Sequence, residues 1–385
     1  MSDSFTEVSS QGWLGRIGSS IKGILVGMLL CGISVVVLFW NEGRAVQTAK
    51  GLDEGLGAVV SASADKVESA NNQQLVHISG KAITDDVLHD EEFHVEQNAI
   101  RLVRLVEMYQ WKEDKDSDTR KKVGGGTETV TTYTYEETWS SSLIDSNSFN
   151  QKHRSTHQNP DTMPVQAKTL HADKVTVGAY RLSPSLRNMI ENAKDVEVSA
   201  ENIPETLTER MQLQGSQTLY LGTNPNEPQI GDCRISFSVT LPADVSVVAQ
   251  QTGDSFQPYQ TKAGDALDML RMGTVGADQM FAMAQAENTQ LTWILRGVGA
   301  VLMFIGLMLI TKPISVLADV LPFLGDLVEM GLGLVAGLLT ITGSCLVIGF
   351  AWVFYRPLIG VPLLLLALGA IVMLFLKRPR RSAAA

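Results

Sequence analysis

The segment IKGILVGMLLCGISVVVLFW, residues 21–40, decides the architecture of this chain. Its only charge, Lys22, lies at one end, and Trp40 marks the other. A helix needs about 20 mainly apolar residues to cross the hydrocarbon core of a bilayer, where only internal hydrogen bonds satisfy the backbone. The segment is long for a cleavable signal peptide, and polar residues 41–44 follow it at once. We therefore expect a retained transmembrane helix.

Three further apolar stretches lie near the C-terminus, at residues 291–310, 332–355 and 358–376. The first contains Arg296, whose long side chain we expect to reach the membrane interface. Only Arg356 and Pro357 separate the other two, which predicts a tight antiparallel hairpin. The sequence thus predicts four spans, one near the N-terminus and three near the C-terminus.

The basic residues beside these spans predict an orientation. Arg16, Lys22, Lys312 and the basic residues after 376 fall on one side if there are four spans, and an excess of Lys and Arg marks the cytoplasmic side. The predicted order is a cytoplasmic tail (1–20), a transmembrane helix (21–40), an extracytoplasmic domain (41–290), a transmembrane helix (291–310), a cytoplasmic interfacial loop (311–331), two transmembrane helices (332–355 and 358–376) and a basic cytoplasmic tail (377–385).

The region between the first two spans is acidic and rich in strand patterns. Residues 43–290 carry a net charge of −13, which argues against nucleic acid because phosphate binding needs clustered positive charge. Alternation and β-branched residues predict strands at 75–79, 127–139, 234–241 and 245–250. Helices are predicted at 184–193 and 266–291. The fold class is therefore four transmembrane helices with a large strand-rich α+β domain.

Residues that could carry chemistry do not form a known motif. His89 and His94, and also His153 and His157, lack the spacing of helical zinc ligands, so we expect solvated loop histidines. The charged and then glycine-rich stretch 112–126 predicts a mobile hairpin tip. We expect no catalytic residue, no cofactor and no metal.

Glycines four residues apart lie in two of the spans, Gly23 with Gly27 and Gly333 with Gly337. This spacing permits close helix contact in lipid. Glycine is also common in membrane helices, so a specific interface and a simple compositional bias both remain open.

Several motifs resemble one protein family along nearly the whole chain. The most specific are Trp40-Asn41-Glu42-Gly43-Arg44-Ala45, Val106-Glu107-Met108-Tyr109-Gln110-Trp111, Gly231-Asp232-x-Arg234, Thr261-Lys262-x-Gly264-Asp265 and Trp352-x-Phe354-Tyr355-Arg356-Pro357. Their order is similar to that of the LUMA family, also called transmembrane protein 43.

The resemblance implies four spans and a large lumenal domain. Animal members of that family are endoplasmic reticulum and inner nuclear membrane proteins that self-associate and organise complexes. For this chain the resemblance suggests a bacterial homologue, in the inner membrane with a periplasmic domain. The resemblance implies no catalytic residue.

The candidate functional positions are polar and aromatic residues within these motifs: Glu42, Arg44, Glu107, Tyr109, Trp111, Asp232, Arg234, Lys262, Asp265 and Arg356. Their alternative role is an internal framework of ion pairs and aromatic contacts at the base of the domain. In that framework we expect Arg44 to pair with Asp232 or Asp265.

The leading functional hypothesis is a non-enzymatic multi-pass membrane scaffold that self-associates and organises membrane protein or lipid assemblies. Its expected partners are membrane lipids, further copies of the chain and other membrane proteins, with no nucleic acid. The alternative is a membrane protein that binds or transports a lipid or small molecule.

Overall fold

The computed structural model describes residues 3–150, 152–362 and 365–366. Three helices dominate it: α1 (Trp13–Ala58), α3 (Ala277–Ala318) and α4 (Pro322–Tyr355). Each is long and apolar enough to cross a membrane. They contain the predicted spans at 21–40, 291–310 and 332–355. Most of the fourth predicted span, at residues 363–364 and 367–376, and the whole tail 377–385 lie outside the described residues.

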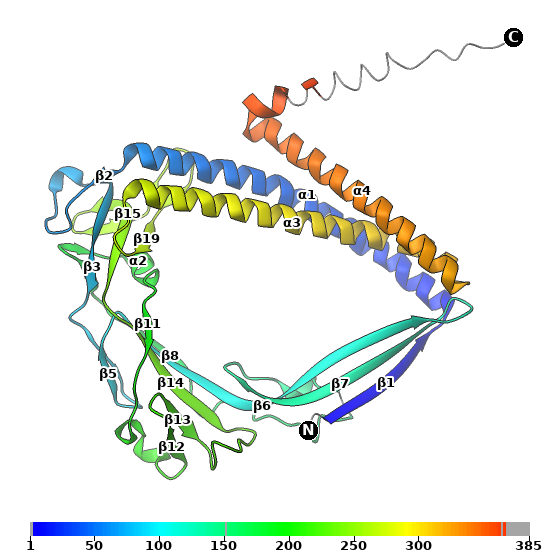
Figure 1. The fold of residues 1–385 in the computed structure, drawn as a ribbon, viewed down its shortest axis with the longest axis horizontal. Helices are drawn as coiled ribbons and strands as arrows, with labels where there is room; N and C mark the ends of the chain where they lie inside the picture. The colour runs from blue at the N-terminus through cyan, green and yellow to red at the C-terminus, as the bar shows by residue number, and fades with distance from the viewer. Residues whose placement is uncertain (1–2, 151, 363–364, 367–385) are drawn as a thin grey trace.

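Helices α1 and α3 lie side by side along most of their length (Figure 1). A Cβ atom at Gly27 would lie 2.6 Å from the carbonyl oxygen of Gly306, so only glycine permits this approach. The Gly23 and Gly27 face therefore packs inside the chain. The predicted helix at 266–291 begins only at Ala277, because residues 266–272 instead form two short strands. The predicted helix at 184–193 is the short α2 (Pro184–Asn188).

The first sheet has eight strands and contains the predicted strands 127–139 and 234–241. Its main order is β1-β7-β6-β14-β13-β12; β11 also pairs with β14, and β8 with β6. The bounds are β1 (Asp3–Gln11), β6 (Arg101–Lys121), β7 (Thr127–Ser140), β8 (Lys168–His171), β11 (Ala193–Asp195), β12 (Met211–Gln214), β13 (Thr218–Leu221) and β14 (Cys233–Thr240).

The second sheet has seven strands in the order β19-β15-β16-β10-β9-β3-β2, and β15 also pairs with β3. It contains the predicted strands 75–79 and 245–250. The bounds are β2 (Val60–Ser61), β3 (Leu75–Ile83), β9 (Thr176–Val177), β10 (Tyr180–Arg181), β15 (Ala243–Thr252), β16 (Ser255–Gln257) and β19 (Met269–Met272). Two small pairs are β4 (Val87–Asp90) with β5 (Val95–Asn98), and β17 (Tyr259–Gln260) with β18 (Ala266–Leu267).

One hydrophobic core joins the two sheets. Its largest fully buried side chains include Phe93, Tyr180 and Phe237, and Ile78 and Val247 contribute from the paired strands β3 and β15. Burying a large apolar side chain stabilises a fold by about 1.5–3 kcal/mol. This core explains the alternation seen in the sequence and confirms the strand-rich domain.

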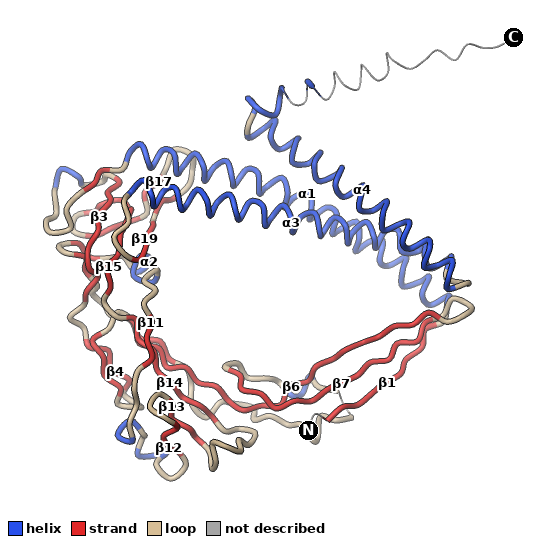
Figure 2. Tube along the Cα trace, viewed as in Figure 1, coloured by secondary structure: helices blue, strands red, loops and turns tan. Residues whose placement is uncertain are grey.

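The β6–β7 hairpin leaves this core and reaches the far ends of α1 and α3 (Figure 2). Residues 112–121, predicted to be part of a mobile tip, continue as strand β6, and only residues 122–126 form the turn. There Arg16 donates to the carbonyl of Gly125 at 2.6 Å, and the amide of Gly124 donates to the carbonyl of Val320 at 3.2 Å. The turn is thus fastened to the helices.

The N-terminal segment also differs from its prediction as a cytoplasmic tail. Residues 3–11 form β1, which pairs with β7 over nine register positions, from Asp3 opposite Tyr135 to Gln11 opposite Thr127. The structure therefore joins residues 3–11, the turn 122–126 and the α3–α4 corner, segments that the predicted organisation assigns to opposite sides of a membrane.

A disulfide cross-link tests this arrangement. Val8 and Val130 are register partners, and such Cα atoms lie about 4.5–5.5 Å apart, within reach of a disulfide. We expect Val8→Cys with Val130→Cys, in a chain lacking Cys31, Cys233 and Cys345, to form an intrachain disulfide under mild oxidation. Non-reducing electrophoresis and peptide mass spectrometry would detect it.

The matched control pairs Val8→Cys with Thr138→Cys. Position 138 lies eight residues farther along β7, about 26 Å away, so no disulfide should form. Equal cross-linking of both pairs, or none with Val130→Cys, would refute the β1–β7 pairing.

Candidate functional site

A buried ion pair joins the three long helices. Glu42 of α1 has no exposed surface, and Arg296 of α3 donates to both of its carboxylate oxygens, at 2.6 and 2.9 Å. The indole Nε1 of Trp352 in α4 donates to the same carboxylate at 2.8 Å. Bidentate, charge-assisted bonds of this kind are strong and fix geometry. Arg296 thus turns inward to Glu42. The prediction that its side chain reaches the membrane interface is wrong.

Uncharged polar groups extend this contact toward the domain. Arg44 donates to the Asn288 side chain at 3.0 Å and to the Thr292 hydroxyl at 3.1 Å. Asn41 donates to the backbone carbonyl of Thr292 at 3.0 Å. The predicted pairing of Arg44 with Asp232 or Asp265 is therefore wrong. Arg44 lies on the face of α1 that packs against α3, and its partners there are an amide and a hydroxyl.

Aromatic and cationic groups at the C-terminal end of α4 lie beside these polar contacts. The guanidinium of Arg356 lies 5.9 Å from the ring centre of Trp352, within the range of a cation–π contact. A Cβ atom at Gly43 would lie 2.7 Å from the Tyr355 ring, which explains the glycine between Glu42 and Arg44. A crevice of about 400 Å³ lies beside Arg296, Trp352 and Arg356. We call residues 41–44, 288, 292, 296, 352 and 356 the interhelical polar layer.

A second group of the predicted residues lies on the first sheet, away from the helices. The Arg234 guanidinium lies 3.9 Å above the Trp139 ring, and the Tyr109 ring lies 5.0 Å from the same indole. Glu107 is the register partner of Arg234. The Tyr109 hydroxyl donates to Glu137 at 3.2 Å. These contacts form a cross-strand framework, the alternative role weighed for these positions.

Asp232 and Trp111 hold the loops that flank this framework. Asp232 accepts from the Tyr220 hydroxyl at 2.5 Å and from the backbone amide of Gln229 at 2.8 Å. Burial and the hydrogen bond to Asp232 raise the pKa of Tyr220 above its ordinary value. The backbone of Trp111 donates to Asn159 at 2.7 Å. Both contacts order irregular chain, so they are structural.

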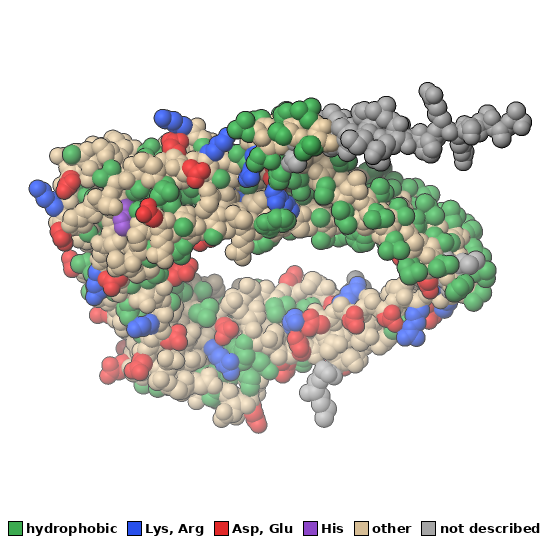
Figure 3. Space-filling model, turned by 45° about the horizontal axis from the view of Figure 1, so that its top comes forward, with side chains coloured by type: hydrophobic (Ala, Val, Ile, Leu, Met, Phe, Trp, Pro, Cys, Tyr) green, Lys and Arg blue, Asp and Glu red, His purple; other side chains and the backbone are tan. Residues whose placement is uncertain are grey.

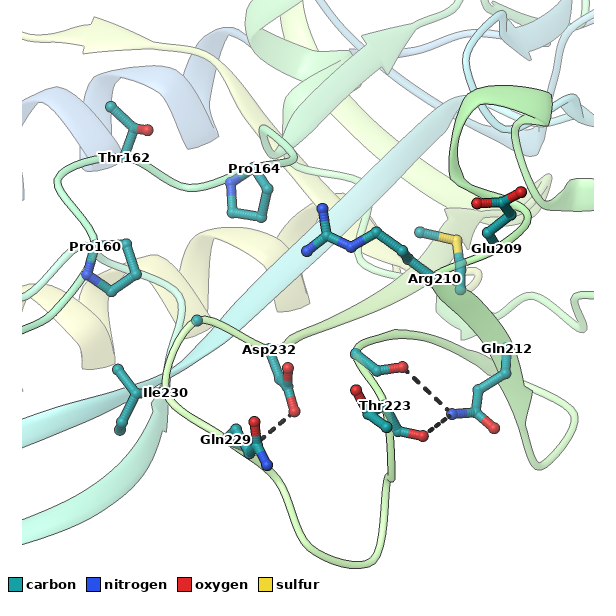
Figure 4. Close-up of a pocket in the computed structure, with 13 residues that line it drawn as sticks. Pro160, Thr162, Pro164, Glu209, Arg210, Gln212, Thr223, Gln229, Ile230 and Asp232 are labelled. Atoms are coloured by element: carbon teal, nitrogen blue, oxygen red, sulfur yellow. Dashed lines mark hydrogen bonds between the residues drawn. The ribbon is translucent and has the colours of Figure 1, made fainter.

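Asp232 also lines an open groove of about 740 Å³ (Figure 4). Its walls come from the loop 160–164, strand β12 and the loops at 222–223 and 229–232. Gln212 donates to the carbonyl of Thr223 at 3.1 Å across one side. The lining is mainly polar, so the groove suits water or a polar chain segment better than an acyl chain.

Lys262 and Asp265 lie in a turn that docks against α1. The amide of Lys262 donates to Glu54 at 2.9 Å, and the amide of Asp265 donates to the Thr261 hydroxyl at 3.0 Å. A Cβ atom at Gly51 would lie 3.0 Å from the Cβ atom of Asp265. The ten predicted residues therefore occupy three places: the contact between the helices holds Glu42, Arg44 and Arg356, the first sheet and its loops hold five, and this turn holds Lys262 and Asp265.

A further ion-pair cluster at the far end of the helices was not predicted. Arg16 contacts Asp319 at 2.5 Å, and Lys121 of the hairpin contacts Asp319, Asp326 and Glu329 at 2.8–3.0 Å. Burial lowers the pKa of Lys121, but hydrogen bonds to the three carboxylates outweigh this effect and raise it above its ordinary value. The acidic residues that interrupt the apolar loop 311–331 were the sequence feature that could have indicated this cluster.

Removing one member of the buried ion pair should destabilise the protein. Glu42→Ala leaves Arg296 without its carboxylate, and breaking a buried pair costs about 3–5 kcal/mol. We expect a clear fall in melting temperature of the detergent-solubilised protein. The double variant Glu42→Ala with Arg296→Ala should lose less than the sum of the single variants. Asp53→Asn, an exposed site on α1, is the control, and an equal loss there would contradict the role of the pair.

Comparisons with known proteins all lead to one family of transmembrane proteins. The family model described as Transmembrane protein 43 matches residues 108–357. The rat protein named Transmembrane protein 43 is 36% identical over 372 residues, 94% of this chain and 91% of the rat protein. The mouse protein is 35% identical, covering 92% and 89%. A Drosophila melanogaster homologue is 30% identical, covering 89% and 91%. No solved structure matches the chain. The chain belongs to the transmembrane protein 43 family.

Proposed function

We propose that this family member is a non-enzymatic membrane scaffold that self-associates and organises membrane protein or lipid assemblies. The chief support is the outer face of α4. No described residue lies within 4 Å of a Cβ atom built at Gly333 or Gly337. Leu334, Leu338 and Ile341 beside them are more than 60% exposed. This face has small and apolar side chains and no partner among the described residues.

The glycines of the other two helices make the contrast. Gly27 and Gly306 are in contact with each other's helix, so the chain uses small residues where helices approach closely. In lipid, such residues let a second helix pack at short distance. Gly333 and Gly337 offer the same opportunity to a helix of another molecule. A second copy is the partner proposed first, and other membrane proteins could use the same face.

The proposed setting is a membrane, with lipid over the remaining apolar helix surface. Hydrophobic side chains cover much of the helices in the space-filling view (Figure 3). In a bacterial cell this setting would be the inner membrane, with the strand-rich domain in the periplasm.

A carrier of lipids or small molecules would need an apolar cavity. The groove beside β12 and the crevice beside Trp352 are lined mainly by polar groups. A cleft of about 540 Å³ at the hairpin end of the helices has a larger apolar share, but the charged side chains of Arg16, Lys121 and Glu329 line it too. We therefore favour the scaffold.

Bulky side chains on the outer face of α4 should weaken self-association. Gly333→Leu with Gly337→Leu would block close helix contact, so we expect a smaller assembly than that of the unaltered chain. Mass photometry or native mass spectrometry in mild detergent would measure it.

Gly349→Leu is the matched control, since it lies on α4 with no described residue within 4 Å, and it points about 120° away from Gly337. It should leave the assembly unchanged. A strictly monomeric unaltered chain with no copurifying partner would refute the scaffold, and equal effects of all variants would refute the α4 face.

A further inference from the structure

Three potential metal ligands converge where the N-terminal strand meets the loop after β7. Asp3 of β1 and His153 and His157 of that loop each present a ligand atom, and these atoms lie within 4.8 Å of one another. The two histidines were expected to be solvated loop residues. That expectation is wrong for His157, of which only 3% is exposed.

The hydrogen bonds of His157 leave one ring nitrogen aimed at this point. Its Nδ1 lies 3.0 Å from the carbonyl oxygen of His153 and 3.0 Å from the hydroxyl of Thr156, which itself donates to that carbonyl at 2.9 Å. A carbonyl only accepts, so this contact is a hydrogen bond in the tautomer whose Nδ1 carries the proton, and in that tautomer Nε2 presents its lone pair. Metal-binding histidines are held in the same way, with the second ring nitrogen donating to a carbonyl or carboxylate.

The lone pair of Nε2 has no hydrogen-bond donor among the described residues. The nearest oxygen of Asp3 lies 3.6 Å away, too long for a hydrogen bond and also an acceptor. The ring of His153 likewise makes no hydrogen bond within residues 3–150 and 152–362. Two imidazoles and a carboxylate thus face one another with acceptor atoms, an arrangement that a shared cation would satisfy.

Aromatic rings fix the position of these ligands. The Tyr135 ring stacks on His157 with ring centres 4.1 Å apart, and the Trp111 ring lies edge-on at 4.5 Å. Phe5 of β1 lies 4.8 Å from the His153 ring. Packed walls of this kind hold the imidazoles in place before a metal arrives.

We propose that Asp3, His153 and His157 bind one divalent transition-metal ion. Imidazole nitrogens and a carboxylate suit Zn²⁺ and related first-row ions, and water would complete the coordination. The ion fastens the start of β1 to the loop after β7. It thereby couples the N-terminal segment before α1 to the strand-rich domain.

Metal stoichiometry on the full chain tests the proposal. The detergent-solubilised protein is first stripped with a chelator and then incubated with Zn²⁺. After gel filtration it should retain one Zn²⁺ per chain, measured by elemental mass spectrometry. Co²⁺ should give the visible absorption of a four-coordinate site. Losing even an outer-shell partner costs about 10–100-fold in affinity, so His153→Ala and Asp3→Asn should each weaken binding by at least this factor.

The control variant is His89→Ala with His94→Ala, which removes two imidazoles from the β4–β5 hairpin. It should bind Zn²⁺ as the unaltered chain does. Asp3 and His153 are not buried, so both test variants should keep the unaltered melting profile without metal. Absence of stoichiometric Zn²⁺ in the unaltered chain, or unchanged affinity in both test variants, would overturn the site.

Discussion

The buried carboxylate of Glu42 is the constraint on which the other helix contacts depend. A charge without exposed surface is tolerated only when it is paired and hydrogen-bonded, and here one donor comes from α3 and another from α4. The pair therefore fixes how far each helix is shifted along the others. Arg44, two residues farther along α1, also contacts α3, through neutral groups. Since α1 and α3 lead directly into the two ends of the strand-rich domain, the same register also places the domain.

The sequence predicted the elements whose signal is local. The apolar runs located three long helices, and alternation located β3, β7, β14 and β15. It did not predict the pairing of β1 with β7 or the ordered hairpin. Charge and glycine in residues 112–126 are typical of mobile loops, but carboxylates of α4, some 200 residues later, neutralise Lys121 and hold the turn. Counting basic residues beside the spans cannot detect such distant pairing.

The sequence predicted the residues that α1 contributes to the candidate site, but not their partners on α3. Motif residues such as Glu42 and Arg44 are visible in the chain, whereas Arg296 lies 254 positions from Glu42 and was expected to reach the interface. Arg44 was assigned an acidic partner because opposite charge is the simplest expectation. Its actual partners, Asn288 and Thr292, are uncharged and carry no sequence signal of pairing. Asp3 and His157 are likewise far apart in the sequence, which is why their approach appears only in the fold.

The β6–β7 hairpin contacts the α1 and α3 helix pair at the turn 122–126, and the strand-rich domain connects the two at their other ends (Figure 1). Helix α1 has 46 residues, about 69 Å, and β6 has 21 residues, also about 69 Å. Because the lengths match, an insertion of one helical turn would move the α3–α4 corner about 5.4 Å beyond the turn at 122–126 unless the strands grew by nearly two residues each. A change in the length of the helices must therefore be matched by a change in the length of the hairpin. Because the outline of the molecule is closed, the lengths of the apolar helices and of the polar strands constrain each other.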